Sequence, residues 1–153
     1  MTFAIRVATV ADAPIIVAHR RAMFEDMGER AQDKLDALSA AFETWVTERL
    51  ARGEYHGWLA MDAQNQVIAG AGLWLLAWPS TPHDQSAQRG YIFNVYTQPV
   101  FRRRGLARQL MHVILDWCRA QSIRVVGLHA SDDGRALYEA LGFKPTNEMR
   151  LKL

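Results

Sequence analysis

The stretch that decides the fold runs from residue 91 to residue 121 and reads YIFNVYTQPVFRRRGLARQLMHVILDWCRAQ. Its first seven residues are rich in aromatic and β-branched side chains, which favours a strand, and Pro99 marks a turn after it. Beyond this turn, apolar residues recur at helical spacing and predict one continuous buried helix face. They are Leu106, Leu110, Val113, Ile114 and Trp117. The sequence therefore places a well-anchored helix directly after an apolar strand.

The start of this helix has no capping residue. The first N–H groups of a helix lack partners within it, and Ser, Thr, Asp or Asn usually supplies one. Here the preceding residues are Phe101 and the three arginines Arg102 to Arg104, whose side chains accept no hydrogen bond. The free donors and the helix dipole favour a bound anion, and Gly105 and Ala107 leave room for a ligand near the backbone. The pattern predicts an anion site, although three arginines alone are more often a solvated patch.

The rest of the chain supplies strands and helices around one sheet. We expect strands at 3–7, 55–61, 67–76, 91–97 and 123–129, and a last one through Met149, Leu151 and Leu153. Helices are expected from a Thr9/Asp12 capping box to Gly28, then at 35–52, 106–121 and 131–141. Gly70 and Gly72 within a strand indicate a bulge or a close backbone approach. The order β-α-α-β-β-β-α-β-α-β predicts an α/β (α+β) three-layer domain over residues 1–153.

Composition narrows the function classes. A length of 153 residues fits one domain, and a net charge of +2 does not indicate a nucleic-acid partner. The single cysteine, Cys118, excludes an intrachain disulfide and a cysteine-based zinc site and suits a reducing cytoplasm. No signal peptide or membrane span is recognisable. We expect a cytoplasmic protein with no metal, no nucleic-acid partner and no membrane partner.

Two segments leave alternatives open. The acidic residues around the first helix end are either a solvated helix end or a lip that attracts a cationic substrate. They are Glu25, Asp26, Glu29 and Asp33. The loop from Trp78 to Arg89 is longer than most connections. It is either a wall of an acceptor pocket or a plain surface excursion.

Two motifs resemble those of the GNAT family of N-acetyltransferases. The family's acetyl-CoA motif, Gln/Arg-x-x-Gly-x-Gly/Ala, stands here as Arg102-Arg103-Arg104-Gly105-Leu106-Ala107. A second family motif stands as Leu137-Tyr138-Glu139-Ala140-Leu141-Gly142-Phe143. The two motifs occur in the family's order, and the predicted element order also matches, so the resemblance covers essentially the whole chain.

The resemblance implies a three-layer α-β-α fold with a mixed, mainly antiparallel sheet splayed at its central strand. It implies acetyl-CoA as acyl donor, held by the strand end, the arginine-rich turn and the last helix. The cofactor-binding residues expected from it are Val95, Tyr96, Thr97, Arg102, Arg103, Arg104, Gly105, Leu106, Ala107, Arg108, Ser131 and Arg135. The acceptor would be a small-molecule or peptide amine. Dimers are common in the family, which leaves a homodimer open.

For catalysis, the resemblance assigns the general acid to Tyr138, which would protonate the departing thiolate. The chain departs from the family at two positions. Ser131 stands where many members have Asn, and Phe93 and Asn94 stand where many have a glutamate base. Candidate bases are Glu25, Glu29, His83 and His129, or a water chain, and His129 at a strand end is the preferred one.

Three other functions compete with this one. A non-catalytic acyl-CoA binder would hold the donor without releasing thiol. A nucleic-acid module using Arg102 to Arg104 would show steep salt dependence, and the low net charge disfavours it. A transferase of another acyl group also stays open.

Overall fold

The computed structural model describes residues 3–153 and is built on a five-stranded sheet with strand order β1-β2-β3-β4-β5. The strands are β1 (Ala4–Val7), β2 (Tyr55–Met61), β3 (Val67–Ala77), β4 (Gln88–Thr97) and β5 (Val126–Leu128). Neighbouring strands are antiparallel except β4 and β5, which run parallel. The mixed, mainly antiparallel sheet predicted from the sequence is confirmed.

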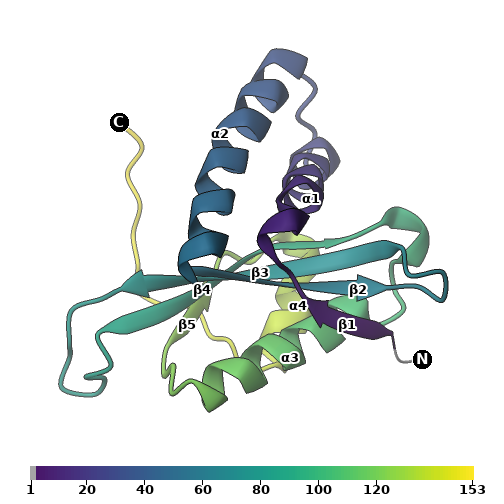
Figure 1. The fold of residues 1–153 in the computed structure, drawn as a ribbon. Coiled ribbons are helices and arrows are strands. Elements are labelled where there is room, and N and C mark those ends of the chain that lie inside the picture. Colours follow the sequence, from purple (N-terminus) through teal and green to yellow (C-terminus); the bar gives the residue numbers. More distant parts are fainter. Residues whose placement is uncertain (1–2) are drawn as a thin grey trace.

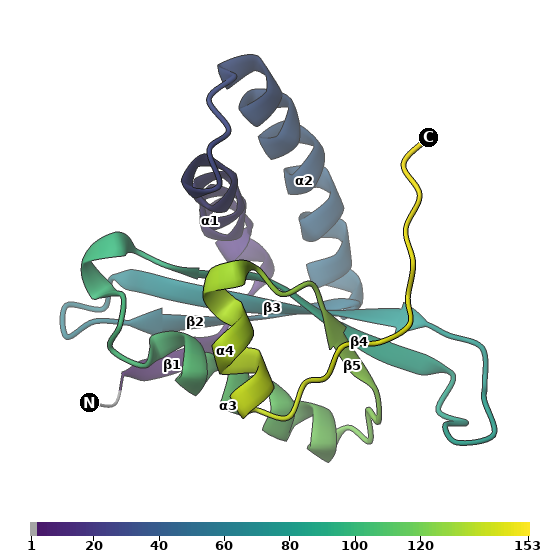
Figure 2. The same ribbon diagram turned by 180° about the vertical axis from the view of Figure 1, so that it is seen from behind.

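Helices cover both faces of this sheet. They are α1 (Ala13–Asp26), α2 (Gln32–Arg52), α3 (Leu106–Ala120) and α4 (Asp132–Ala140), with short 3-10 turns η1 (Val10–Asp12) and η2 (Pro99–Phe101). Helices α1 and α2 lie on one face of the sheet, and α3 and α4 lie on the other (Figure 1). In the view from behind, α4 lies in front of α3 (Figure 2). The predicted three-layer α-β-α arrangement is therefore confirmed.

Each face of the sheet has its own hydrophobic core. Under α3, the side chains of Leu110, Met111 and Ile114 are fully buried against the sheet. On the opposite face, Ile16 from α1 and Val46 from α2 pack against β2. The helical stripes predicted from the spacing of apolar residues are those that the fold buries. Burial of α3 along its length fixes the position of its first turn.

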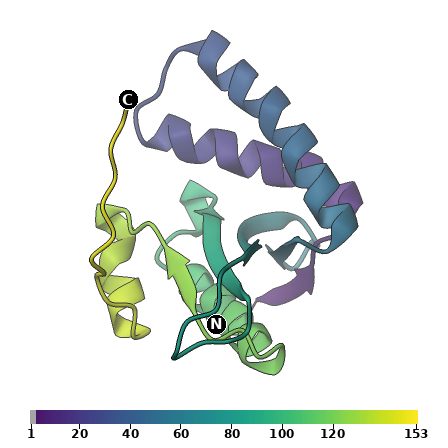
Figure 3. The same ribbon diagram turned by 90° about the vertical axis from the view of Figure 1, so that its left-hand side faces the viewer.

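Two differences separate the fold from the sequence-based expectation. Strand β5 pairs only over Val126–Leu128, shorter than the predicted 123–129. The predicted C-terminal strand is wrong: residues 144–153 form no strand, and Met149 and Leu151 are 95% and 80% exposed. This segment rises along the side of the molecule that carries α1 and α2, away from the sheet edge (Figure 3). Alternation of apolar and charged residues needs a neighbouring strand to form a ladder, and residues 144–153 pair with no strand of the described fold.

No helix among residues 3–153 combines the length and the apolar character required to cross a lipid bilayer.

Candidate active site

The site is centred on the point where β4 leaves its neighbours. Strands β4 and β5 pair only from Gly90 to Ile92 and diverge beyond. On the other side, Gly70 pairs with Tyr96 while Gly72 pairs with Phe93, so β4 carries one extra residue there. The shift in register between Gly70 and Gly72 is a β-bulge, and a β-bulge changes the direction of the strand. The splayed central strand predicted from the family resemblance is present.

Asn94 occupies the bulge and is held from two sides. Its φ angle is 55°, in the left-handed region. Its Nδ2 donates to the Tyr55 hydroxyl at 3.1 Å, and its Oδ1 accepts from Nη1 of Arg20 at 2.8 Å. A Cβ on Gly72 would lie 1.8 Å from the Tyr55 hydroxyl oxygen, so only glycine fits beneath this ring. The bulge and the close approach expected at Gly70 and Gly72 are both confirmed.

The N-terminus of α3 lies at the open end of the splay. Gly105 is its N-cap residue, and no side chain caps the helix, as predicted. Arg103 and Gly105 both have positive φ angles, of 61° and 81°. A turn of this kind directs successive backbone N–H groups toward a common point and favours an anion. A Cβ built on Gly105 would meet no atom within 4 Å, so the space beside this turn is open.

The three arginines before α3 have different environments. Arg102 forms an ion pair with Asp26 at the end of α1, and its Nε donates to the Thr97 carbonyl at 2.9 Å. Arg104 donates to the Val100 carbonyl at 3.2 Å. Arg103 lines the cavity described next, as does Arg108 from the first turn of α3. Arg102 therefore ties α1 to the turn, while Arg103 and Arg108 are the cations available to a ligand.

One continuous cavity of about 1170 Å³ joins this turn to the layer of α1 and α2. This volume exceeds that of most single small-molecule sites, so the cavity can hold a long ligand and a second molecule. At one end the lining residues belong to β4, η2 and α3 and include Val95, Tyr96, Thr97, Leu106 and Ala107. At the other end they are Arg20, Phe24, Phe42, Trp45, Trp74, Tyr91 and Phe93. We call these the turn end and the aromatic end.

Tyr138 projects into the cavity from α4. Its side chain is 9% exposed, and burial raises the pKa of its hydroxyl. The ring packs against Phe143 at a centroid distance of 6.1 Å, and a Cβ on Gly134 would lie 2.7 Å from it. Within residues 3–153 its hydroxyl makes no hydrogen bond, so the group is a positioned, protonated donor facing the cavity.

Ser131 and Arg135 of the same helix have other partners. The Ser131 hydroxyl caps α4 by accepting from the Gly134 N–H at 3.2 Å, although the residue also lines the cavity. Arg135 is exposed, lies 3.6 Å from the Glu139 carboxylate and is not among the lining residues. Of the residues predicted from the family motifs, Arg104 and Arg135 are the two that do not line the cavity.

Of the four candidate bases, only His129 lines the cavity. It packs edge-on against Tyr91 at 5.5 Å, and Nη2 of Arg150 contacts its ring nitrogens. Because arginine can only donate, the ring nitrogen that Arg150 contacts is the acceptor of that contact.

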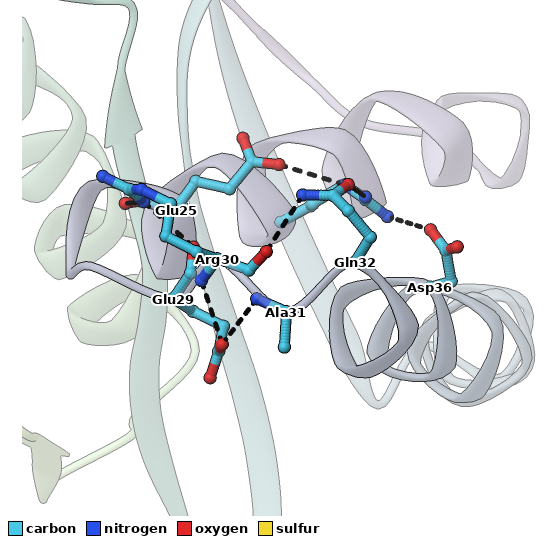
Figure 4. Close-up of polar contacts among 7 residues, drawn as sticks. Glu25, Glu29, Arg30, Ala31, Gln32 and Asp36 are labelled. Carbon is cyan, nitrogen blue, oxygen red and sulfur yellow. Dashed lines mark hydrogen bonds and ion pairs between the residues drawn. The ribbon is translucent and has the colours of Figure 1, made fainter.

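Two of the acidic residues at the end of α1, Glu25 and Glu29, are bound to neighbours rather than aimed at the cavity. Glu29 accepts from the N–H groups of Arg30 and Ala31, both at 2.9 Å (Figure 4). These bonds hold the pKa of Glu29 below its usual value. Glu25 pairs with Arg21 at 3.2 Å. A solvated helix end fits these contacts, and Asp26 is the one residue of the four that lines the cavity.

The predicted loop from Trp78 to Arg89, whose last two residues belong to β4, contributes no lining residue, so it is the surface excursion rather than a pocket wall. The wall comes from α1 and α2 instead. Sequence reasoning missed Arg20, the most distinctive residue there. A signal was present: Arg20 lies four residues after Ile16 and three before Met23, on the apolar face of α1.

Comparison with known proteins agrees with this geometry. Residues 18–143 match the Acetyltransferase (GNAT) family. A GCN5-related N-acetyltransferase from Ralstonia eutropha JMP134 shares 33% identity with a TM-score of 0.91, and the match covers 99% of each chain. A predicted acetyltransferase from Clostridium acetobutylicum, solved with acetyl-CoA, shares 28% identity with a TM-score of 0.88, over 99% of this chain and 96% of that one.

More distant structures share the fold alone. Glucosamine-6-phosphate N-acetyltransferase from Arabidopsis thaliana has 16% identity and a TM-score of 0.69, with 100% of this chain and 99% of that chain covered. No curated protein sequence matches the chain.

Proposed function

This chain belongs to the Acetyltransferase (GNAT) family and is an acetyltransferase, and we propose that its acceptor is the amine of a small molecule or peptide bound at the aromatic end. The observation that carries this proposal is the single cavity that joins the uncapped start of α3, Tyr138 and the wall of α1 and α2. A donor site and an acceptor site that share one cavity allow direct attack of the amine.

The turn end fits acetyl-CoA, which supplies an activated acetyl thioester when bound. The uncapped N–H groups around Arg103 and Gly105 suit a pyrophosphate, and Arg103 and Arg108 add positive charge. The backbone of Val95 to Thr97, beyond the last pairing of β4 with β5, suits an amide-containing arm. We therefore assign donor binding to this end, largely through backbone groups.

The β-bulge is suited to stabilise developing negative charge. The register shift between Gly70 and Gly72 redirects the backbone of β4 around Asn94 and Val95. A preorganised N–H donor at such a position stabilises an oxyanion more than it stabilises a neutral carbonyl. We assign this role to the N–H group of Val95 or Tyr96.

Tyr138 is assigned as general acid. Its buried hydroxyl has a raised pKa and is protonated at neutral pH. As the acceptor nitrogen forms its bond to the acetyl carbon and the carbon–sulfur bond breaks, the hydroxyl proton passes to the departing sulfur. A general acid contributes to turnover and not to ground-state affinity, which separates this role from a packing role.

His129 is assigned as the group that takes the proton from the amine, directly or through water. It is the one of the four candidate bases that lies on the cavity wall. The assignment predicts that His129→Gln lowers kcat/KM and removes the low-pH limb of its pH profile. An unaltered profile would leave the proton to a water chain.

The deciding experiment is release of free thiol from acetyl-CoA across a panel of amines, with Tyr138→Phe beside the wild type. We expect Tyr138→Phe to lower kcat by about a hundredfold, in line with general acid catalysis, with little change in the acetyl-CoA Kd. Unchanged turnover would remove Tyr138 as the acid. Tight acetyl-CoA binding without thiol release for any amine would instead support a non-catalytic binder.

A further inference from the structure

Arg20 is the one cation among the described residues that line the aromatic end of the cavity. A second guanidinium, that of Arg49, stacks on Trp45 but pairs with Glu54 and does not line the cavity. The guanidinium carbon of Arg20 lies 4.7 Å from the Phe42 ring centroid, 5.2 Å from that of Phe24 and 5.5 Å from that of Phe93. Trp45, Trp74 and Tyr91 line the same end. These contacts fix the guanidinium plane within the cavity wall, since arginine stacks readily on aromatic faces.

Arg20 has fewer polar partners than its chemistry demands. Nη1 donates to Asn94, whereas Nε is buried and has no hydrogen-bond partner among the described residues. None of the ion pairs found within residues 3–153 includes Arg20. Burial lowers the pKa of Arg20. Among the described residues, the hydroxyls of Tyr55 and Tyr91 are the groups that act in the opposite direction and raise it. An arginine stays charged in such a setting, so this charge is not balanced by the protein.

The carboxylates on the cavity wall are too committed or too distant to balance it. Among the lining residues they are Asp26 and Asp133. Asp26 is paired with Arg102 at the turn end, and Asp133 lies in the first turn of α4, on the other side of the sheet. Neither forms an ion pair with Arg20. A buried charge without a counter-ion is unfavourable unless a ligand completes the pair.

We propose that the acceptor is an amine that carries a carboxylate, as an amino acid with an apolar or aromatic side chain does, and that Arg20 binds this carboxylate. A cavity end lined by one guanidinium matches one negative charge better than the two of a phosphate group. The rings around it would pack against the apolar part of the acceptor. This inference rests on the proposed function, since it names the substrate class of the same site.

Matched pairs of acceptors test the inference in the thiol-release assay. L-Phenylalanine is compared with 2-phenylethylamine, and L-leucine with 3-methylbutylamine, because each pair differs only by the carboxylate. We expect the amino acid to have a kcat/KM at least about tenfold higher, mainly through KM, as a hydrogen-bonded charge pair provides. Equal or better use of the decarboxylated amines would overturn the inference.

Substitutions at two neighbouring arginines locate the effect. Arg20→Met should abolish the preference for the carboxylate while leaving the acetyl-CoA Kd unchanged, and Arg20→Lys should retain part of it. Arg21→Met is the matched control, because Arg21 lies on the same helix but pairs with Glu25 and Asp36. A preference that survives in Arg20→Met, or that Arg21→Met removes equally, would contradict the assignment.

Binding of product-like probes tests the role of the Arg20 charge without the need for turnover. In the presence of coenzyme A, calorimetry compares N-acetyl-L-phenylalanine with N-acetyl-2-phenylethylamine on the wild type and on Arg20→Lys. We expect at least about tenfold tighter binding of the carboxylate probe to the wild type. If no amine is acetylated, the proposed function fails while this measurement still decides the role of Arg20, and equal affinities would reject it.

Discussion

The two ends of the cavity are built by different means. At the turn end, the chain offers backbone groups of one continuous segment, from the β-bulge in β4 to the first turn of α3. At the aromatic end, side chains from α1, α2, β3 and β4 meet around Arg20. Backbone groups are common to every sequence that adopts the turn, whereas a set of side chains is particular to one sequence. The turn end can therefore serve a donor shared by a family, and the aromatic end can define an individual acceptor.

The same difference separates the electrostatics of the two ends. Cations at the turn end are exposed, and Arg102 has a carboxylate partner. Arg20 at the aromatic end is half-buried, and the neutral amide of Asn94 is its one polar partner within residues 3–153. Because water screens exposed charges, a substitution at the turn end must act through the backbone or through steric bulk to have a large effect. At the aromatic end, a substitution that removes the charge of Arg20 is sufficient for a large effect.

The largest expected effect comes from placing bulk and negative charge on the turn. Gly105→Glu fills the open space beside the N-terminus of α3 with a carboxylate, where an anion is expected to bind. We predict loss of acetyl-CoA affinity by more than about a hundredfold, measured by calorimetry. Retained affinity would show that the pyrophosphate lies elsewhere and would end the assignment of the turn end.

Gly53→Glu is the matched control for this experiment. Gly53 also has a positive φ angle, of 69°, and open space around its Cβ position, but it ends α2 and does not line the cavity. Both substitutions impose the same type of backbone strain and the same added charge. A comparable loss of affinity in both variants would indicate general destabilisation rather than a local effect on the donor site.

The turn end could be predicted from the sequence, and the aromatic end could not. The missing cap before Leu106 and the glycine at position 105 are local features, and both predict the geometry found. Arg20 and Asn94 are 74 residues apart and meet only through the tertiary fold. The predicted C-terminal strand fails for a related reason, since alternation in residues 149–153 says nothing about whether a neighbouring strand is present.

We expect the stability of the protein to depend on pH through a histidine of α1, one of the elements that line the aromatic end. His19 of α1 is 8% exposed, and burial lowers its pKa from 6.5 to about 4. Above pH 6.5 the ring is neutral in both the folded and unfolded states and has no effect. As the pH falls from 6.5 toward 4, the unfolded state binds a proton first, so the free energy of unfolding decreases. We expect a loss of about 2 kcal/mol at pH 5, measured by urea denaturation.

Two variants locate this pH dependence. His19→Phe retains a ring of similar size beside Tyr96, whose centroid lies 5.0 Å from that of His19, and should make the free energy of unfolding less dependent on pH. His112→Gln, at an exposed position on α3, should leave the dependence unchanged. If both variants keep the wild-type slope, the titrating group lies elsewhere and α1 is not the pH-sensitive element.

The smallest expected effect tests whether donor binding depends on the side-chain hydroxyl that lines the cavity at the start of α4. Ser131 lines the cavity, yet its hydroxyl accepts from the Gly134 N–H at the start of α4. If the donor is held mainly by backbone groups, Ser131→Ala should cost about 1 kcal/mol of folding stability, as loss of an N-cap does. The acetyl-CoA Kd should change by less than about threefold. Denaturation and calorimetry on the same preparation measure the two quantities.

Ser131→Asp completes the test, because aspartate also caps helices but places a negative charge beside the donor site. We expect stability close to that of the wild type together with weaker acetyl-CoA binding, the opposite of the alanine result. If Ser131→Ala instead weakens binding strongly with no loss of stability, the hydroxyl contacts the donor directly. The turn end would then depend on side chains as the aromatic end does, and the contrast between them would lie in charge alone.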